Sequence, residues 1–225
     1  DTVLMNSFDF VLWDWNGTLL DDLEMNLQIV DVLLSNHKIK NGVSREFYLE
    51  NFAFPISRFY EKIGFDLSKH DFMALADEYD EEYLSRLPET TLFKNAESTL
   101  AALSSGKVHQ AVISATEHER LVSQVKSYGI EKYFDAVLGT ENHLGKGKVA
   151  VAEEWLKKSG ANPERTVFIG DTLHDFECSK AIGCACFLIA RGHNSKEKLL
   201  KTGCEVFDDI GEIKERVLEK GGEKN

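Results

Sequence analysis

Hydrophobic and polar positions follow two different patterns along this chain. From residue 109 onward, short apolar runs alternate with amphipathic stretches. The apolar runs predict strands at 110–113, 134–138, 167–169, 184–190 and 205–207. The amphipathic stretches predict helices at 117–128, 148–159, 174–182, 195–202 and 210–219. Strands that alternate with helices of this length are typical of βαβ units and a parallel sheet, to which the apolar run at 8–13 also belongs.

Residues 21–92 follow a different pattern, in which apolar side chains recur at helical spacing. They do so twice, at Leu23, Leu27, Val30 and Leu34, and again at Phe72, Leu75, Tyr79 and Tyr83. No run in this block has the pattern of a strand. The chain is therefore expected to be an α/β protein whose core, residues 1–20 plus 93–225, carries an all-helical insert at 21–92.

Composition narrows the range of partners. The chain has 225 residues, of which 43% are hydrophobic and 28% charged, and this suits a globular core with a smaller second unit. The net charge of −12 argues against nucleic acid and anionic membranes, because both attract basic surfaces. No apolar run approaches the roughly 18 residues of a membrane span. We expect a small-molecule partner and a monomer or homodimer.

The cysteines and the first residues bear on the compartment. Cys178, Cys184, Cys186 and Cys204 lack the spacing of a zinc site. The first residues show no basic stretch followed by an apolar one, so no secretion signal is expected. Reduced thiols in a cytoplasmic protein are the resulting expectation.

The first candidate site residue is Asp14, at the end of the apolar run that begins at Phe10. The turn Asn16-Gly17-Thr18 follows at once. A carboxylate at the end of a parallel strand lies in the crevice where open α/β sheets bind ligands. The alternative is an aspartate that caps a turn.

Two further segments place polar side chains next to expected strands or helices. Ser114 and Ala115 follow an apolar run, where the serine could instead cap the next helix. Lys146 and Lys148 precede the helix at 148–159. A lysine at a helix start opposes the helix dipole, which favours a role in binding an anion over a solvated surface position.

The fourth segment ends the run at 167–169 with Gly170 and Asp171, and Asp175 follows. Residues four apart on a helix share a face, so the two carboxylates can converge. Like charges this close need a cation, and Mg²⁺ prefers carboxylate oxygens.

In this order and spacing, the four segments resemble the motifs of the haloacid dehalogenase superfamily. Those motifs are Asp-x-Asp-x-Thr, a strand-terminal Ser or Thr, a Lys before a helix, and Gly-Asp-x-x-x-Asp. A helical insert directly after the first motif resembles the cap of phosphoglycolate phosphatases and their relatives. The resemblance implies a Rossmann-like core under a helical cap, and a Mg²⁺-dependent phosphatase for a small phosphorylated metabolite.

The resemblance also implies roles for single residues. Asp14 would be the nucleophile and a metal ligand, and the main-chain carbonyl of Asn16 would bind the metal. Ser114 would hydrogen-bond the transferring phosphoryl group. Asp171 would complete the metal site, with Asp175 either ligating or orienting.

Further positions are implied for the phosphate itself. Gly17, Thr18 and Ala115 would contribute to its binding. A lysine would neutralise it: Lys146 lies 25 residues before Asp171 and Lys148 lies 23. Lys148 is preferred because it directly precedes the helical pattern.

Asn16 departs from the pattern, because phosphatases of this superfamily carry there an Asp that protonates the leaving group. General acid–base help is worth about 10²–10⁴ in rate. The favoured interpretation is a phosphatase in which Asp21, Asp22, His118 or the substrate replaces the missing acid. The alternative is a slow or degenerate member that acts as a phosphate-binding or regulatory protein.

Substrate selection is expected to come from the insert. Arg58 is one of its 7 basic residues, against 15 acidic ones, and could bind a carboxylate or phosphate. The alternative is a surface arginine paired with a glutamate. The segment 189–193 could form part of the rim, and His174 is expected to be a bystander.

Overall fold

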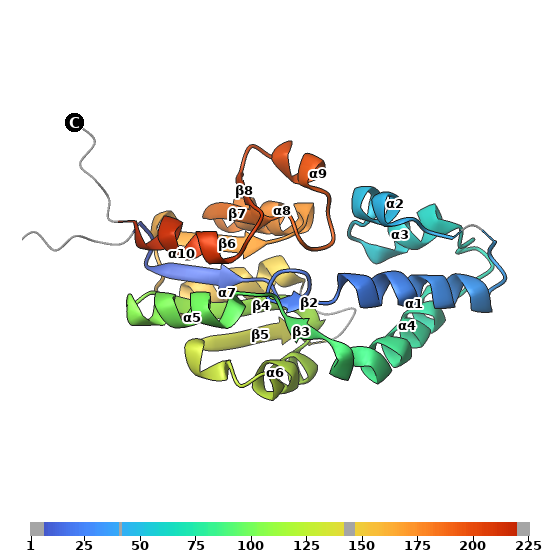
Figure 1. Cartoon of the computed structure of the whole chain (residues 1–225), viewed down its shortest axis with the longest axis horizontal. Helices are drawn as coiled ribbons and strands as arrows, with labels where there is room; N and C mark the ends of the chain where they lie inside the picture. The colour runs from blue at the N-terminus through green and yellow to red at the C-terminus, as the bar shows by residue number, and fades with distance from the viewer. Residues whose placement is uncertain (1–6, 41, 142–146, 220–225) are drawn as a thin grey trace, which may run out of the picture.

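The computed structural model describes residues 7–40, 42–141 and 147–219, and its centre is a six-stranded parallel sheet (Figure 1). The strands run in the order β5-β4-β1-β6-β7-β8. Their bounds are β1 Phe10–Trp13, β4 His109–Glu117, β5 Ala136–Thr140, β6 Thr166–Gly170, β7 Ala185–Ile189 and β8 Glu205–Phe207. The α/β fold expected from the sequence is confirmed.

Helices cover both faces of the sheet because side chains alternate along each strand. In β1, Val11 and Trp13 face one apolar cluster and Leu12 faces another. The first cluster includes α5 Ala96–Ser105, α6 His118–Ser127 and α10 Gly211–Leu218. The second includes α7 Lys148–Ser159 and α8 Leu173–Ile182. The sheet is therefore the middle of three layers.

Four helices between β1 and β4 enclose an apolar cluster of their own. They are α1 Leu23–Asn36, α2 Arg45–Asn51, α3 Ile56–Ile63 and α4 Phe72–Arg86, and together we call them the cap. An antiparallel pair, β2 Leu20–Asp21 and β3 Thr91–Leu92, lies where the chain enters and leaves the cap. The domain boundaries after residue 20 and before residue 93 stay a prediction; the first divides β2 and the second falls directly after β3.

Several elements differ from the expectation. The strand predicted at 110–113 continues to Glu117, with a shift of register against β5 after Ile113. The helix predicted at 195–202 is the shorter α9 Lys196–Leu200, and α5 was not predicted. Three short 3₁₀ helices complete the part of the chain that the structure describes: η1 Leu87–Glu89, η2 Glu131–Tyr133 and η3 Pro163–Arg165.

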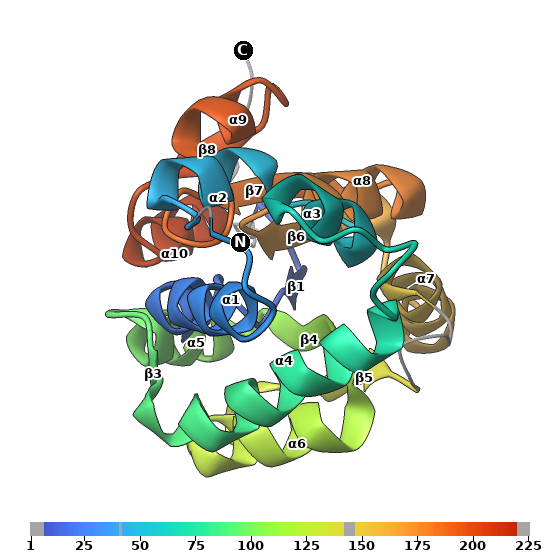
Figure 2. The same cartoon turned by 90° about the vertical axis from the view of Figure 1, so that its right-hand side faces the viewer.

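The register of β1 positions the site. Trp13 lies opposite Val112 of β4 on one side and Ile169 of β6 on the other. Asp14 and Asp171, which follow β1 and β6, and Ser114, near the end of β4, therefore meet at one edge of the sheet, the place where open α/β sheets bind ligands. Figure 2, which looks onto the cap, shows α1 and α4 lying in front of the strand ends.

Candidate active site

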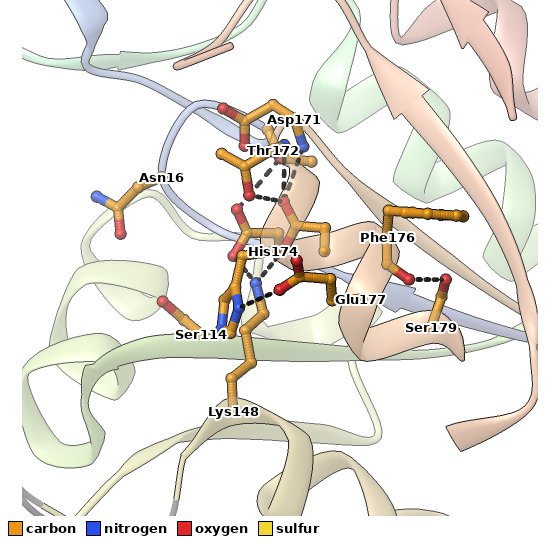
Figure 3. Close-up of polar contacts among 12 residues, drawn as sticks. Asn16, Ser114, Lys148, Asp171, Thr172, His174, Phe176, Glu177 and Ser179 are labelled. Atoms are coloured by element: carbon orange, nitrogen blue, oxygen red, sulfur yellow. Dashed lines mark hydrogen bonds and ion pairs between the residues drawn. The ribbon is translucent and has the colours of Figure 1, made fainter. Parts of the chain in front are cut away.

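Lys148 bridges two carboxylates at the sheet edge. Its Nζ lies 2.5 Å from Asp14 Oδ1 and 2.5 Å from Asp175 Oδ1. Figure 3 shows the side chain rising from the start of α7 toward this edge. Burial opposes the charge of the ammonium, but the two carboxylates outweigh it and raise the pKa of Lys148. The geometry thus favours Lys148 as the basic residue, while Lys146 lies outside the described residues.

Asp175 is anchored from its other oxygen. Oδ2 accepts hydrogen bonds from the main-chain N–H of Asp171 (3.0 Å), the N–H of Thr172 (2.9 Å) and the Thr172 hydroxyl (2.8 Å). These contacts close the first turn of α8 as a capping box. A Cβ at Gly170 would overlap the Asp175 carboxyl group, so this position requires glycine.

Asp171 is fully buried between two loops. Its Oδ1 accepts a hydrogen bond from the Thr18 hydroxyl at 2.8 Å, and its Oδ2 accepts one from the His193 N–H at 2.6 Å. A Cβ at Gly17 or at Gly192 would overlap the Asp171 carboxylate. The two glycines therefore let the chain close tightly around this side chain.

The donor set fits a divalent cation. Asp14, Asp171 and Asp175 each offer a carboxylate oxygen, and these oxygens all lie within 4.8 Å of one another. The single ammonium of Lys148 contacts two of these three buried carboxylates. Buried like charges at this range are unfavourable without a cation, and Mg²⁺ takes carboxylate oxygens.

Burial and close packing also shift the pKa values of these three carboxyl groups. Burial and the neighbouring Asp175 carboxylate raise the pKa of Asp14 to about 6, although Lys148 opposes the shift. Burial raises the pKa of Asp171 well above its ordinary value. For Asp175 burial acts in the same direction, but Lys148 and Thr172 outweigh it and hold the pKa low.

Asn16 uses every polar atom of its side-chain amide. Its Nδ2 donates to Asp22 Oδ2 at 2.8 Å and to the Tyr83 hydroxyl at 2.7 Å. Its Oδ1 accepts a hydrogen bond from the Thr116 hydroxyl at 3.1 Å. Asn16 thus joins the sheet edge to the cap and holds no proton that it could give away and take back.

His193 is buried, although the sequence placed it only at a rim. Its Nε2 lies 3.0 Å from Asp22 Oδ1, and its Nδ1 lies 2.9 Å from the Tyr48 hydroxyl. Burial disfavours the imidazolium, but Asp22 outweighs it and raises the pKa of His193 to about 9. In the sequence, only the position of His193 just after β7 indicated a place near the site, and nothing there indicated its contacts with Asp22 and Tyr48.

A cavity of about 270 Å³ lies between the sheet edge and the cap. Asp14, Asn16, Ser114, Ala115 and Lys148 line its sheet side. Four phenylalanines and four tyrosines line it elsewhere, and all eight belong to the cap: Phe52, Phe54, Phe59, Phe72, Tyr48, Tyr60, Tyr79 and Tyr83.

Gly17 and Thr18 are near the site but do not line the cavity. Their main-chain N–H groups donate to the carbonyls of Leu20 (2.9 Å) and Trp15 (3.3 Å). Both amides are therefore used inside the turn that follows Asp14, and these residues shape the loop.

Three other candidates lie away from the cavity lining. Arg58 is exposed on α3, Asp21 is in β2, and His118, at the start of α6, accepts a hydrogen bond from the Gly139 N–H. Of the residues suggested as replacements for the missing acid, Asp22 lines the cavity. The arginine that does line it is Arg120, which the sequence did not single out.

The chain belongs to a known enzyme family. The family model described as haloacid dehalogenase-like hydrolase matches residues 11–189. This stretch includes all four motifs and the cap, so the chain is a haloacid dehalogenase-like hydrolase, as the resemblance implied. No helix within the described residues combines the length and apolarity needed to cross a bilayer.

Similar proteins are known by sequence and by structure. A phosphoglycolate phosphatase of Vibrio cholerae is 25% identical over 225 residues, covering 95% of this chain and 99% of that one. A predicted phosphatase from Clostridium acetobutylicum superposes with a TM-score of 0.78 at 20% identity, covering 94% and 99% of the two chains. A Deinococcus radiodurans hydrolase with bound phosphate and sodium gives 0.74 at 20% identity, covering 96% and 98%. The two structural matches support the fold.

Proposed function

We propose that this hydrolase is a Mg²⁺-dependent phosphatase that cleaves a small phosphate monoester through an aspartyl phosphate on Asp14. One observation carries the proposal. The buried Asp14 carboxylate faces the cavity, in contact with Lys148 and within 4.8 Å of Asp171 and Asp175. The phosphatases among the similar proteins support the reaction type.

The chain's own residues account for most of the proposed reaction. An Asp14 oxygen attacks phosphorus, a new O–P bond forms, and the bond to the leaving oxygen breaks with its electron pair. Lys148 compensates charge on the phosphoryl group and favours ionised Asp14. Ser114, which lines the cavity, turns its hydroxyl from Thr116 Oγ1, to which it donates at 3.1 Å, and donates to a phosphoryl oxygen instead. Water then attacks phosphorus, which releases inorganic phosphate and restores the Asp14 carboxylate.

The proposed metal site uses Asp14, the main-chain carbonyl of Asn16 and Asp171. Asp175 acts chiefly by orienting Lys148 and α8, because its Oδ1 contacts the Lys148 ammonium and its Oδ2 accepts three hydrogen bonds at the start of α8. When bound, Mg²⁺ offsets negative charge on the phosphoryl oxygens and on the two buried carboxylates.

The proposed setting is the cytoplasm. All four cysteines are free in the structure, and free thiols are typical of reducing compartments.

Turnover of p-nitrophenyl phosphate with Mg²⁺ tests the proposed function. We expect Asp14→Asn to lower kcat by at least about 10³-fold, because loss of a nucleophile removes the covalent route. Asp31→Asn, on the exposed face of α1, is the matched control and should keep full activity. Equal rates in the wild type and Asp14→Asn would contradict the proposal and favour the binding or regulatory alternative.

A further inference from the structure

We propose that the substrate's leaving group is aromatic and that its phosphate is attached through a phenolic oxygen. This inference rests on the proposed phosphatase function and adds the substrate class. The phenolate leaves with the electron pair of the P–O bond and takes a proton from water, which leaves hydroxide. A second water later divides the aspartyl phosphate into the Asp14 carboxylate and dihydrogen phosphate, which neutralises the hydroxide.

The first support is the nature of the cavity wall. Rings from the cap contact one another around it: Phe52 lies 5.7 Å from Phe54 and 5.5 Å from Phe59 between centroids. Phe54 also lies 4.7 Å from the ring of His174. Aromatic pairs favour stacked and edge-to-face contacts at these separations, so a flat ring is a suitable occupant.

The second support is size. A dry cavity of about 150 Å³ lined by apolar side chains binds benzene. The cavity here measures about 270 Å³. It therefore holds one aromatic ring and leaves space for the phosphoryl group beside Asp14.

The third support is charge, which disfavours a leaving group that carries a carboxylate. Among the described residues that line the cavity, each cation already has an acidic partner. Arg120 Nη1 lies 3.0 Å from Asp80 Oδ2, Lys148 contacts Asp14 and Asp175, and His193 contacts Asp22. A second anionic group would meet Asp22 and Asp80 without a free cation to bind it, and a neutral ring avoids this cost.

The fourth support is Asn16, which cannot protonate a departing oxygen. A phenol has a pKa of about 10, as in tyrosine. An aliphatic alcohol is a far weaker acid, with a pKa close to that of water. The phenolate therefore leaves as an anion far more readily than an alkoxide. A site that carries Asn16 in place of the acid and is lined by aromatic rings suits the same substrate for two independent reasons.

Three substrates test the inference with Mg²⁺ present: phenyl phosphate, benzyl phosphate and 2-phosphoglycolate. Phenyl phosphate should have the highest kcat/KM, about 10-fold or more above each of the others. Benzyl phosphate has the ring but an alkoxide leaving group, so a rate equal to that of phenyl phosphate would overturn the phenolic assignment. A higher kcat/KM for 2-phosphoglycolate would overturn the inference as a whole.

Two phenylalanines with similar exposure provide a matched pair of variants. Phe54 is 38% exposed and lines the cavity, whereas Phe47 is 40% exposed on α2 and does not line it. Phe54→Ala should raise KM for phenyl phosphate about 10-fold and leave KM for acetyl phosphate, which has no ring, unchanged. Phe47→Ala should change neither value. An equal effect of Phe54→Ala on both substrates would contradict a ring contact.

Acetyl phosphate also distinguishes failure of the proposed phosphatase function from failure of the aromatic assignment alone. Its leaving group needs little protonation, so a working phosphatase should hydrolyse it in a manner that depends on Asp14. If no such turnover occurs, the proposed function is wrong. If acetyl phosphate is hydrolysed but phenyl phosphate is not preferred over 2-phosphoglycolate, only the aromatic assignment fails.

Discussion

The two walls of the cavity are built in different ways. On the sheet side, Asp171 and Asp175 each accept hydrogen bonds at both oxygens, and Lys148 bridges two carboxylates. On the cap side, rings such as Phe52 and Phe54 contact one another through their faces and edges. The sheet wall is thus suited to one charged group held in one geometry, and the cap wall to an apolar group of suitable size.

The contrast between the two walls assigns the reaction to the sheet side and the choice of substrate to the cap. Polar contacts with short, directed bonds tolerate little displacement, since an unpaired buried charge is costly. Apolar contacts are less directional and tolerate changes of shape. Substitutions in the sheet wall should therefore change stability and turnover together, whereas those in the cap should change mainly which substrate is used.

The largest effect is expected at Lys148. Lys148→Met leaves Asp14 and Asp175 buried without their counter-ion, and removing one partner of a buried pair costs about 3–5 kcal/mol. Lys158→Met, on the same helix at a side chain 75% exposed, should cost less than about 0.5 kcal/mol. Urea unfolding without Mg²⁺ measures both values. Similar losses of unfolding free energy in the two variants would show that the buried contacts of Lys148 contribute no more to stability than an exposed ion pair does.

The next effect concerns metal binding at the sheet wall. At a Mg²⁺ concentration of 100 times Kd, a single site should stabilise the wild type by about 2.7 kcal/mol. For a chain of this size the corresponding rise in Tm is about 5–10 °C. Asp171→Asn should abolish the rise, and Asp31→Asn should retain it. A rise that persists in Asp171→Asn would place the ion elsewhere.

A smaller effect is expected where the two walls meet, at Asn16. Asn16→Asp places a carboxyl group about where the amide now lies 2.8 Å from Asp22, so the pair would share a proton. We expect kcat for benzyl phosphate to rise about 10- to 100-fold, within the usual range of general acid catalysis. The rise for phenyl phosphate should be smaller, because its leaving group needs less protonation. Equal gains for both esters would contradict the role assigned to Asn16.

The smallest effect is expected inside the cap, where Glu78 of α4 accepts hydrogen bonds from Asn36 Nδ2 and His37 Nε2, both at 2.8 Å. Burial opposes its charge, but these partners hold the pKa of Glu78 below its ordinary value of 4.5. The contribution of ionised Glu78 to the free energy of unfolding is therefore fully present above pH 4.5 and is lost as the pH falls through the lowered pKa.

Glu78→Gln should cost about 1 kcal/mol or less at neutral pH, with no change in kcat. The difference in Tm from the wild type should close as the pH falls through the lowered pKa. Glu81→Gln, at an exposed position of the same helix, is the control and should show no such closing. A constant difference at every pH would show that the ionised carboxylate is not the stabilising species.

Much of the sheet wall could be predicted from sequence. Asp14, Ser114 and Asp171 each follow an apolar run, and parallel strands bring such positions to one edge. Asp171 and Asp175 are spaced by one helical turn, and Lys148 begins the helix that the periodicity predicts. These signals are local, because each depends on residues within a few positions of one another.

The cap wall could not be predicted in the same way. Phe52 and Phe54 look from sequence like ordinary core residues. The sequence left Arg58 open between substrate binding and a surface position, and it did not single out Arg120, which lines the cavity. His193 gained its partners from Asp22 and Tyr48, which are far away in sequence. Side-chain contacts across such separations depend on how the cap lies on the core, and no short stretch of residues encodes that.

The amino-acid sequence by itself determined the parallel α/β core, the helical insert and the four motif segments, because periodicity and spacing act over short stretches of chain. The tertiary structure alone decided that Asn16 is held by Asp22 and Tyr83, that Lys148 bridges two carboxylates, and that aromatic rings face them across the cavity. The physical reason is that burial and pairing are properties of groups brought together from distant parts of the chain, and only the packed fold brings them together.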